Sequence, residues 1–256
     1  MRRAVLLIGG IVATLYCLVC LLLYLGQRSL LYHPMPESRS ERANAIRLER
    51  DGVSLKIWEV ARSSDRALIY FGGNGENVAW SIDDFAKAFP DRSLYLVNYR
   101  GYAGSTGQPT EKALLADAEA VFDIVRASHS DVAVIGCSLG SGVAVYLAGV
   151  RDVRKLVLVT PYDSIESLAR AQFSLIPVSW LLEDTFDSLR RAKNVHAPVL
   201  VLMADGDTVV PRANTERLVA AFAPRQVDAR TIARTDHNSI AGSPEYLESL
   251  RKFLAD

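Results

Sequence analysis

The sequence lacks several features that would identify particular classes of protein. Cysteine occurs only at positions 17, 20 and 137. The first two lie in one apolar stretch, so we expect neither a disulfide framework nor a paired-cysteine zinc site in the rest of the chain. No G-x-x-x-x-G-K-[ST] phosphate loop and no H-E-x-x-H zinc motif is present. We therefore predict no metal and no cofactor.

The chain also lacks an excess of charge of either sign, because 29 Lys and Arg balance 29 Asp and Glu. Without a positive field to attract a phosphate backbone, we expect no nucleic-acid partner. Half of the residues are hydrophobic, which excludes disorder and fibrous repeats. The mean hydropathy of +0.12 is nevertheless high for a soluble protein, and its excess lies at the N-terminus.

Residues 4–26 contain no charged side chain and are apolar almost throughout. A helix of this length reaches about 34 Å, slightly more than a hydrocarbon core of about 30 Å. A cleaved signal peptide is the first alternative, but its apolar region is usually shorter and ends in a small-x-small site, which is missing here. A buried core helix is the second. The sequence favours an uncleaved transmembrane anchor.

The orientation of this anchor depends on the basic residues near its two ends. Two arginines and the terminal amine precede it, and three arginines follow it, at positions 2, 3, 28, 39 and 42. The two sides tie, and the two charges closest to the span are N-terminal. We therefore expect the N-terminus in the cytoplasm and the folded domain in an extracytoplasmic compartment.

After the anchor, residues 27–45 contain Pro34 and Pro36, which oppose helix, and are interpreted as a linker packed on the domain. From residue 46 to 256, short apolar segments alternate with longer amphipathic ones. Strands are expected at 53–60, 67–71, 93–99, 132–136, 155–160, 199–203 and 227–232. Helices are expected near 77–89, 111–128, 139–149, 188–194, 212–222 and 244–255. This alternation predicts an α/β fold with a doubly wound, mostly parallel sheet, whose ligands bind beyond the carboxyl ends of the strands.

One such strand end carries Gly136-Cys137-Ser138-Leu139-Gly140, a G-x-S-x-G pattern between a predicted strand and a predicted helix. A nucleophile on a sharp strand-to-helix turn needs small residues two positions to either side. The pattern therefore predicts that Ser138 is a catalytic nucleophile. The simpler alternative is a glycine-rich turn in which Ser138 only caps the helix.

A serine nucleophile needs a base, and of the four histidines only His237 follows a predicted strand at its carboxyl end. The alternative for His237 is a solvated loop histidine. An orienting carboxylate is available from Asp205 or Asp207, directly after the strand at 199–203, or from Asp163 after the strand at 155–160. The order Ser, Asp, His is the one expected when the nucleophile lies on a turn of this kind.

These residues and their flanks resemble the α/β-hydrolase superfamily, and in particular its single-pass membrane-anchored serine hydrolases. The matching segments are QRSLLYHP after the anchor, FGGNGEN at 71–77, NYRGYAGSTGQPTE at 98–111, GCSLGSG at 136–142, DGDTVVP at 205–211 and DHNSI at 236–240. The resemblance implies Asp207 as the acid and His237 as the base. It also implies an oxyanion hole from the backbone N–H groups of Asn74 and Leu139. The His-Gly-Asn usual in the family reads Gly72-Gly73-Asn74 here.

Together these expectations describe a membrane-anchored serine hydrolase that cleaves a carboxylic ester or thioester of a small-molecule or lipid-like acyl substrate. Two alternatives stay open: a serine peptidase-like hydrolase of the same fold, and a non-catalytic, membrane-tethered binding protein. Residues 164–186 are expected to form a short helical cap or lid that gives an apolar wall near Ser138. Their alternative is a buried helix pair.

Overall fold

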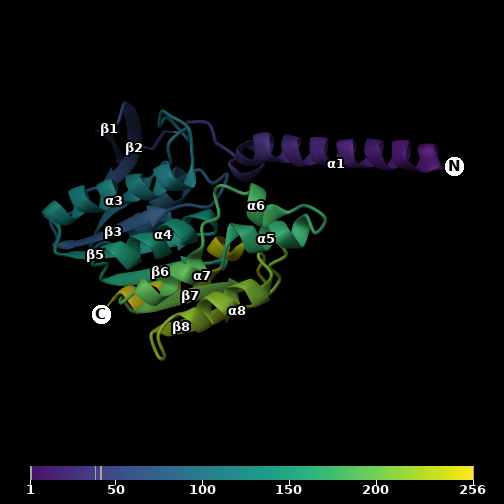
Figure 1. Ribbon diagram of the computed structural model, residues 1–256. Coiled ribbons are helices and arrows are strands. Elements are labelled where there is room, and N and C mark those ends of the chain that lie inside the picture. The colour runs from purple at the N-terminus through teal and green to yellow at the C-terminus, as the bar shows by residue number, and fades with distance from the viewer. Residues whose placement is uncertain (1, 38, 41, 256) are drawn as a thin grey trace.

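The computed structural model describes residues 2–37, 39, 40 and 42–255. Residues 38 and 41 of the predicted linker, and residue 256 of the predicted domain, lie outside the described residues. Helix α1 (Arg2–Leu31) projects from the body as a single rod, with the N-terminus at its far end (Figure 1). The helix continues beyond the predicted anchor, so the first five residues of the predicted linker are helical.

Eight strands of the described chain form one sheet in the order β1-β2-β4-β3-β5-β6-β7-β8. The strands are β1 (Asn44–Arg50), β2 (Val53–Val60), β3 (Arg66–Phe71), β4 (Ser93–Val97), β5 (Asp131–Cys137), β6 (Lys155–Val159), β7 (Val199–Ala204) and β8 (Val227–Ile232). β1 pairs antiparallel with β2 and β2 with β4, and the other pairs are parallel. The predicted doubly wound, mostly parallel sheet is confirmed.

Strand β1 was not expected from the sequence. Its charged residues alternate with apolar ones, and its side chains are exposed or half-buried because it is an edge strand. It begins at Asn44, two residues before residue 46, where the sequence predicts the start of the domain. The buried central strands coincide closely with the predicted segments, because both of their faces are covered.

Helices cover both faces of the sheet. One face is covered by α3 (Glu111–Ser128), α4 (Leu139–Val150), α7 (Ser188–Arg191) and α8 (Arg212–Ala221), and the other by α2 (Ile82–Ala88) and α9 (Pro244–Leu254). Along β3, Ile69 and Phe71 pack into the first core, whereas Leu68 and Tyr70 pack into the second. This period of two is the reason that the central strands read as continuous apolar runs. Short 3₁₀ segments complete the fold: η1 (Val78–Ser81), η2 (Ala192–Asn194) and η3 (Ile240–Gly242).

Between β6 and α7 the chain forms the cap, with helices α5 (Ile165–Gln172) and α6 (Val178–Leu181). No residue of α5 is buried, and Val178 is the single buried residue of α6. The alternative of a buried helix pair is therefore wrong. The cap lies beside α1 at the upper right of the body (Figure 1).

Candidate active site

Ser138 lies on a strained turn between β5 and α4. Its backbone has a φ of 47° and a ψ of −114°, a conformation that costs on the order of 1–3 kcal/mol and is typical of functional sites. A Cβ atom at Gly140 would lie 2.1 Å from the Phe71 carbonyl oxygen, and one at Gly136 would lie 2.4 Å from the Gly140 carbonyl oxygen. Both flanking positions therefore need glycine. The Ser138 side chain makes no capping hydrogen bond, which contradicts the simpler helix-cap alternative.

His237 follows β8 and lies next to Ser138. Its Nε2 atom is 2.8 Å from Ser138 Oγ, and its Nδ1 atom is 2.8 Å from Asp207 Oδ2. The loop that carries it is fixed by Asp236, whose carboxylate accepts hydrogen bonds from the backbone N–H groups of Asn238 and Ser239. The side chain of His237 is 10% exposed and that of Asp207 is 8% exposed. The structure thus brings three predicted site residues into one hydrogen-bonded chain.

Asp207 is held in place by its second carboxylate oxygen. Oδ1 accepts hydrogen bonds from the backbone N–H groups of Val209 and Val210, at 2.9 and 2.8 Å, which leaves Oδ2 for the imidazole. Two bonds to the chain that follows β7 fix the direction of the carboxylate. An oriented acceptor of this kind selects the tautomer of His237 in which Nδ1 carries the proton.

The two other candidate acids make different contacts. Asp205 accepts hydrogen bonds from the backbone N–H groups of Arg234 and Thr235, and these bonds hold the pKa of its carboxyl below the ordinary value. Asp163 is buried and ion-paired with Arg217, and it also accepts a hydrogen bond from Asn214. Asp205 therefore ties the loop after β8 to β7, and Asp163 ties β6 to α8. Geometry places Asp207 alone of the three beside His237.

One predicted oxyanion donor, Leu139, directly follows Ser138, and the other, Asn74, belongs to the turn after β3. Leu139 is the first residue of α4, and N–H groups in the first turn of a helix have no intrahelical acceptor. Asn74 follows β3 in a turn closed by the hydrogen bond from Glu76 N–H to the Gly73 carbonyl, at 3.2 Å. A Cβ atom at Gly73 would lie 3.6 Å from Ser138 Cβ, so this turn packs directly on the serine.

Glu76 supports that turn, and sequence reasoning missed its contribution. Its Oε2 atom accepts a 2.6 Å hydrogen bond from the Gly73 N–H, and its Oε1 atom accepts one of 2.7 Å from the Tyr70 hydroxyl. The carboxylate thus joins the end of β3 to the turn. Where the family usually has His and this chain has Gly72, the hydrogen bonds of Glu76 support the turn. The acidic residue in FGGNGEN was the signal that could have revealed it.

The Asn74 side chain connects the turn to the end of α1. Its amide donates to the Leu31 carbonyl and contacts His33 Nδ1, at 2.5 and 2.8 Å. Its oxygen accepts from the His33 N–H and the Tyr102 hydroxyl, at 3.0 and 2.9 Å. The last turn of α1 is therefore bonded to the residue predicted to donate to the oxyanion.

A cavity of about 470 Å³ opens beside Ser138 and His237. Its wall combines the carboxylates of Glu76 and Asp84 with the aromatic rings of Trp80 and Phe85. Within the described chain, no residue of 164–186 lines it. The expectation that the cap forms a wall near Ser138 is not met, because the cap packs against α1 instead.

Cys137 precedes Ser138 and is the one cysteine of the domain. Burial, followed by the nearby Glu76 carboxylate, raises the pKa of its thiol well above the ordinary value. A thiol in this state is a poor nucleophile near neutral pH. The described residues hold no group of three or more His, Cys, Asp and Glu arranged for a metal ion.

Comparison with known proteins places the chain in a family. No protein-family model matches it. It is 32% identical to the uncharacterized protein Rv2307c of Mycobacterium tuberculosis, over 96% of this chain and 94% of that protein. It is 31% identical to the lysophosphatidylserine lipase ABHD12 of Macaca fascicularis, over 78% of this chain and 58% of that one. The chain belongs to the α/β-hydrolase superfamily.

Solved structures agree with this membership at the level of the fold. The esterase Pf2001 of Pyrococcus furiosus superposes with a TM-score of 0.69 and 18% identity, over 88% of this chain and 98% of that one. In this α/β hydrolase, the residues after β3, β5, β7 and β8 meet at the carboxyl edge of the sheet, where ligands bind in such folds.

Proposed function

We propose that this α/β hydrolase is a membrane-anchored serine hydrolase that cleaves a carboxylic ester or thioester of a small-molecule or lipid-like acyl substrate. The observation that carries the proposal is the hydrogen-bonded chain from Ser138 Oγ through the His237 imidazole to Asp207 Oδ2. A solely structural role would not require a serine on a strained turn to face an imidazole that a carboxylate orients.

In the proposed reaction, His237 Nε2 takes the proton of Ser138 as Oγ attacks the substrate carbonyl. The backbone N–H groups of Asn74 and Leu139 stabilise the oxyanion, and Asp207 stabilises the imidazolium. His237 then gives the proton to the departing alcohol or thiol, which leaves an acyl group on Ser138. Water, activated by the same imidazole, releases the acid and restores the serine.

The proposed domain organisation follows from the position of α1. Residues 4–26 form the membrane anchor, 27–45 the connection and 46–256 the hydrolase domain, with the N-terminus in the cytoplasm. Of the helices in the described chain, α1 is the one long and apolar enough to cross a bilayer. The lipase named among the relatives supports a lipid-like ester as substrate.

The test is labelling of the full-length protein in membranes with a fluorophosphonate, followed by hydrolysis of esters of increasing acyl length. Ser138→Ala should abolish labelling and lower turnover by more than about a hundredfold. Ser130→Ala is the control, since Ser130 is an exposed serine that does not line the cavity, and this variant should keep both labelling and turnover. Labelling that persists in Ser138→Ala, or is absent from the folded wild-type protein, would refute the proposal.

A further inference from the structure

The outer end of the cap exposes large apolar side chains. We call residues 173–180, which connect α5 to α6 and include most of α6, the cap tip. Leu175 is 84% exposed and Trp180 is 89% exposed, and Phe173 beside them is 39% exposed. Side chains of this size are rarely left in water together unless the surface contacts a partner.

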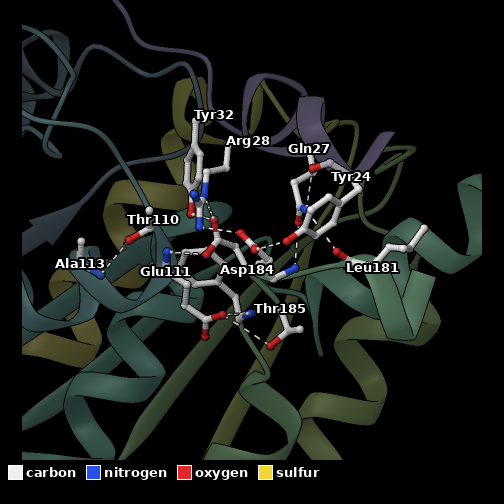
Figure 2. A network of polar contacts seen from close by, with 12 residues as sticks. Tyr24, Gln27, Arg28, Tyr32, Thr110, Glu111, Ala113, Leu181, Asp184 and Thr185 are labelled. Carbon is white, nitrogen blue, oxygen red and sulfur yellow. Dashed lines mark hydrogen bonds and ion pairs between the residues drawn. The ribbon is translucent and has the colours of Figure 1, made fainter. Parts of the chain in front are cut away.

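The cap tip touches α1 far from the point where that helix joins the domain. The Tyr16 hydroxyl donates a 2.8 Å hydrogen bond to the Leu175 carbonyl. Nearer the domain, the contacts are polar. Tyr24 donates to Glu183, and Arg28 pairs with Glu183. Gln27 donates to the Leu181 carbonyl (Figure 2). The cap therefore lies along the second half of α1, with its polar part near the domain and its apolar part farther out.

Helix geometry gives the depth of this contact in a bilayer. From Arg2 to Tyr16 the helix rises only about 21 Å, which is less than a hydrocarbon core of about 30 Å. A span that starts at Arg3 needs about 20 residues and so ends near Leu23. Tyr16 then lies about 10 Å inside the hydrocarbon, and the bonded Leu175 carbonyl lies at the same depth.

We propose that the cap tip is immersed in the leaflet nearer the domain, where Leu175 and Trp180 contact the acyl chains of the bilayer lipid. The partner is the lipid bilayer itself. The proposal rests on the membrane span included in the proposed function and is independent of the chemistry at Ser138. An immersion of about 5–10 Å is the depth at which amphipathic helices lie in membranes.

Several backbone groups of the cap tip are paired, which lowers the free-energy cost of immersing them, because an unpaired polar group costs several kcal/mol in hydrocarbon. The Leu175 carbonyl is paired with Tyr16, so the bond also satisfies the hydroxyl of a tyrosine in the middle of the apolar helix. The backbone N–H groups of Ile176, Val178 and Trp180 each donate to a carbonyl within the tip. Arg170, at the last turn of α5, is long enough to extend its guanidinium toward the lipid headgroups.

A groove of about 160 Å³ between α1 and the cap has an almost wholly apolar wall. It is lined by Leu23 and Leu30 of α1 and by Ala169, Phe173 and Leu181 of the cap. The span ends near Leu23, and Leu30 lies about 10 Å beyond that point, so the groove lies at the level of the lipid headgroups. The surface immersed in hydrocarbon is therefore that of the cap tip.

The experiment measures quenching of tryptophan fluorescence by lipid brominated at acyl carbons 6 and 7, with full-length protein in phosphatidylcholine vesicles. The Trp180 signal is the difference between wild type and Trp180→Phe. We expect brominated lipid to lower this signal at least about twofold relative to ordinary lipid, because a side chain about 5–10 Å deep approaches the bromines.

The matched control is Trp180→Phe combined with Ile124→Trp, which keeps the number of tryptophans. Ile124 is 41% exposed on α3, near the end of that helix that lies away from α1 in Figure 1. The tryptophan at 124 should not be quenched. Equal quenching at the two positions, or none at 180, would overturn the proposal. Extraction of the protein by carbonate would instead overturn the span itself, while ester hydrolysis by the extracted protein would leave the proposed chemistry standing.

Discussion

The acid that orients His237 gives the most specific prediction. The sequence offers three candidate aspartates, and the structure shows that they make different contacts. Asp207→Asn keeps the size of the side chain but puts an amide N–H donor in place of the Oδ2 acceptor that faces His237. This change favours the wrong imidazole tautomer. In a hydrolase of this mechanism, the loss in kcat is about 10⁴-fold, or about 5.4 kcal/mol of transition-state stabilisation.

The change should leave folding almost intact. In Asp207→Asn, the amide oxygen of the introduced side chain can still accept from the backbone N–H groups of Val209 and Val210. We therefore expect a melting temperature close to that of the wild type. The assay is kcat and kcat/KM on a water-soluble ester, together with a thermal melt of the same preparation.

Asp205→Asn and Asp163→Asn are the matched controls. Each should lower the melting temperature while most of the turnover is kept. Loss of the Asp163 charge leaves Arg217 without its ion-pair partner, so the melting temperature should fall while turnover per folded molecule stays within about tenfold. The reasoning is refuted if Asp163→Asn or Asp205→Asn abolishes turnover in folded protein while Asp207→Asn is mild.

Asp205 adds a pH test to the same set. Its folded-state pKa lies below the ordinary value of 3.8 because backbone N–H groups bond the charged form. A depressed pKa contributes stability that is present above the unfolded-state pKa and is lost as the pH falls through the folded-state pKa. When the pH is lowered from neutral to below 3.8, the free energy of unfolding should therefore fall more for the wild type than for Asp205→Asn. Parallel pH–stability curves would contradict this.

Three further predictions concern residues around the site. Glu76→Ala should lower kcat by about 10²-fold or more with a modest loss of stability, because the turn next to Ser138 loses its brace; a folded variant with unchanged kcat would exclude the role. His33→Ala should lower kcat less, by about tenfold, because Asn74 keeps its bond to Leu31, and kinetics with a soluble ester measure this. Trp180→Ala should leave the melting temperature in detergent and soluble-ester kinetics almost unchanged, since the side chain is 89% exposed; a loss of about 3–5 kcal/mol would show a core role instead.

Local sequence determined the parts of the fold that depend on neighbours along the chain. Buried strands such as β5 and β7 were predicted closely because helices cover both faces and their residues are apolar on consecutive positions. The turn at Ser138 was predictable because its glycines face backbone atoms at both flanking positions. Edge strand β1 was not, since its half-exposed, charged pattern resembles that of a polar loop.

Which of the aspartates lies beside His237, by contrast, depends on the tertiary structure. Asp205 and Asp207 both follow β7 and differ by two residues, so residue types alone left both open, and the resemblance to a family favoured Asp207. In the folded chain, Asp205 accepts hydrogen bonds from two backbone N–H groups of the loop after β8, whereas Asp207 is hydrogen-bonded to the His237 imidazole. The groups that these two carboxylates meet at long range come from the loop after β8, about thirty residues away in the sequence.

The surroundings of the site and the position of the cap were likewise decided by packing. The sequence predicted an apolar segment at 164–186, but the side on which it lies depends on contacts with α1, such as those of Tyr16 and Gln27. The brace from Glu76 to Gly73 and the link from Asn74 to the end of α1 are equally tertiary. A sequence states which residues are apolar, acidic or small; which of them meet is decided by long-range contacts that only the closed sheet and its covering helices bring together.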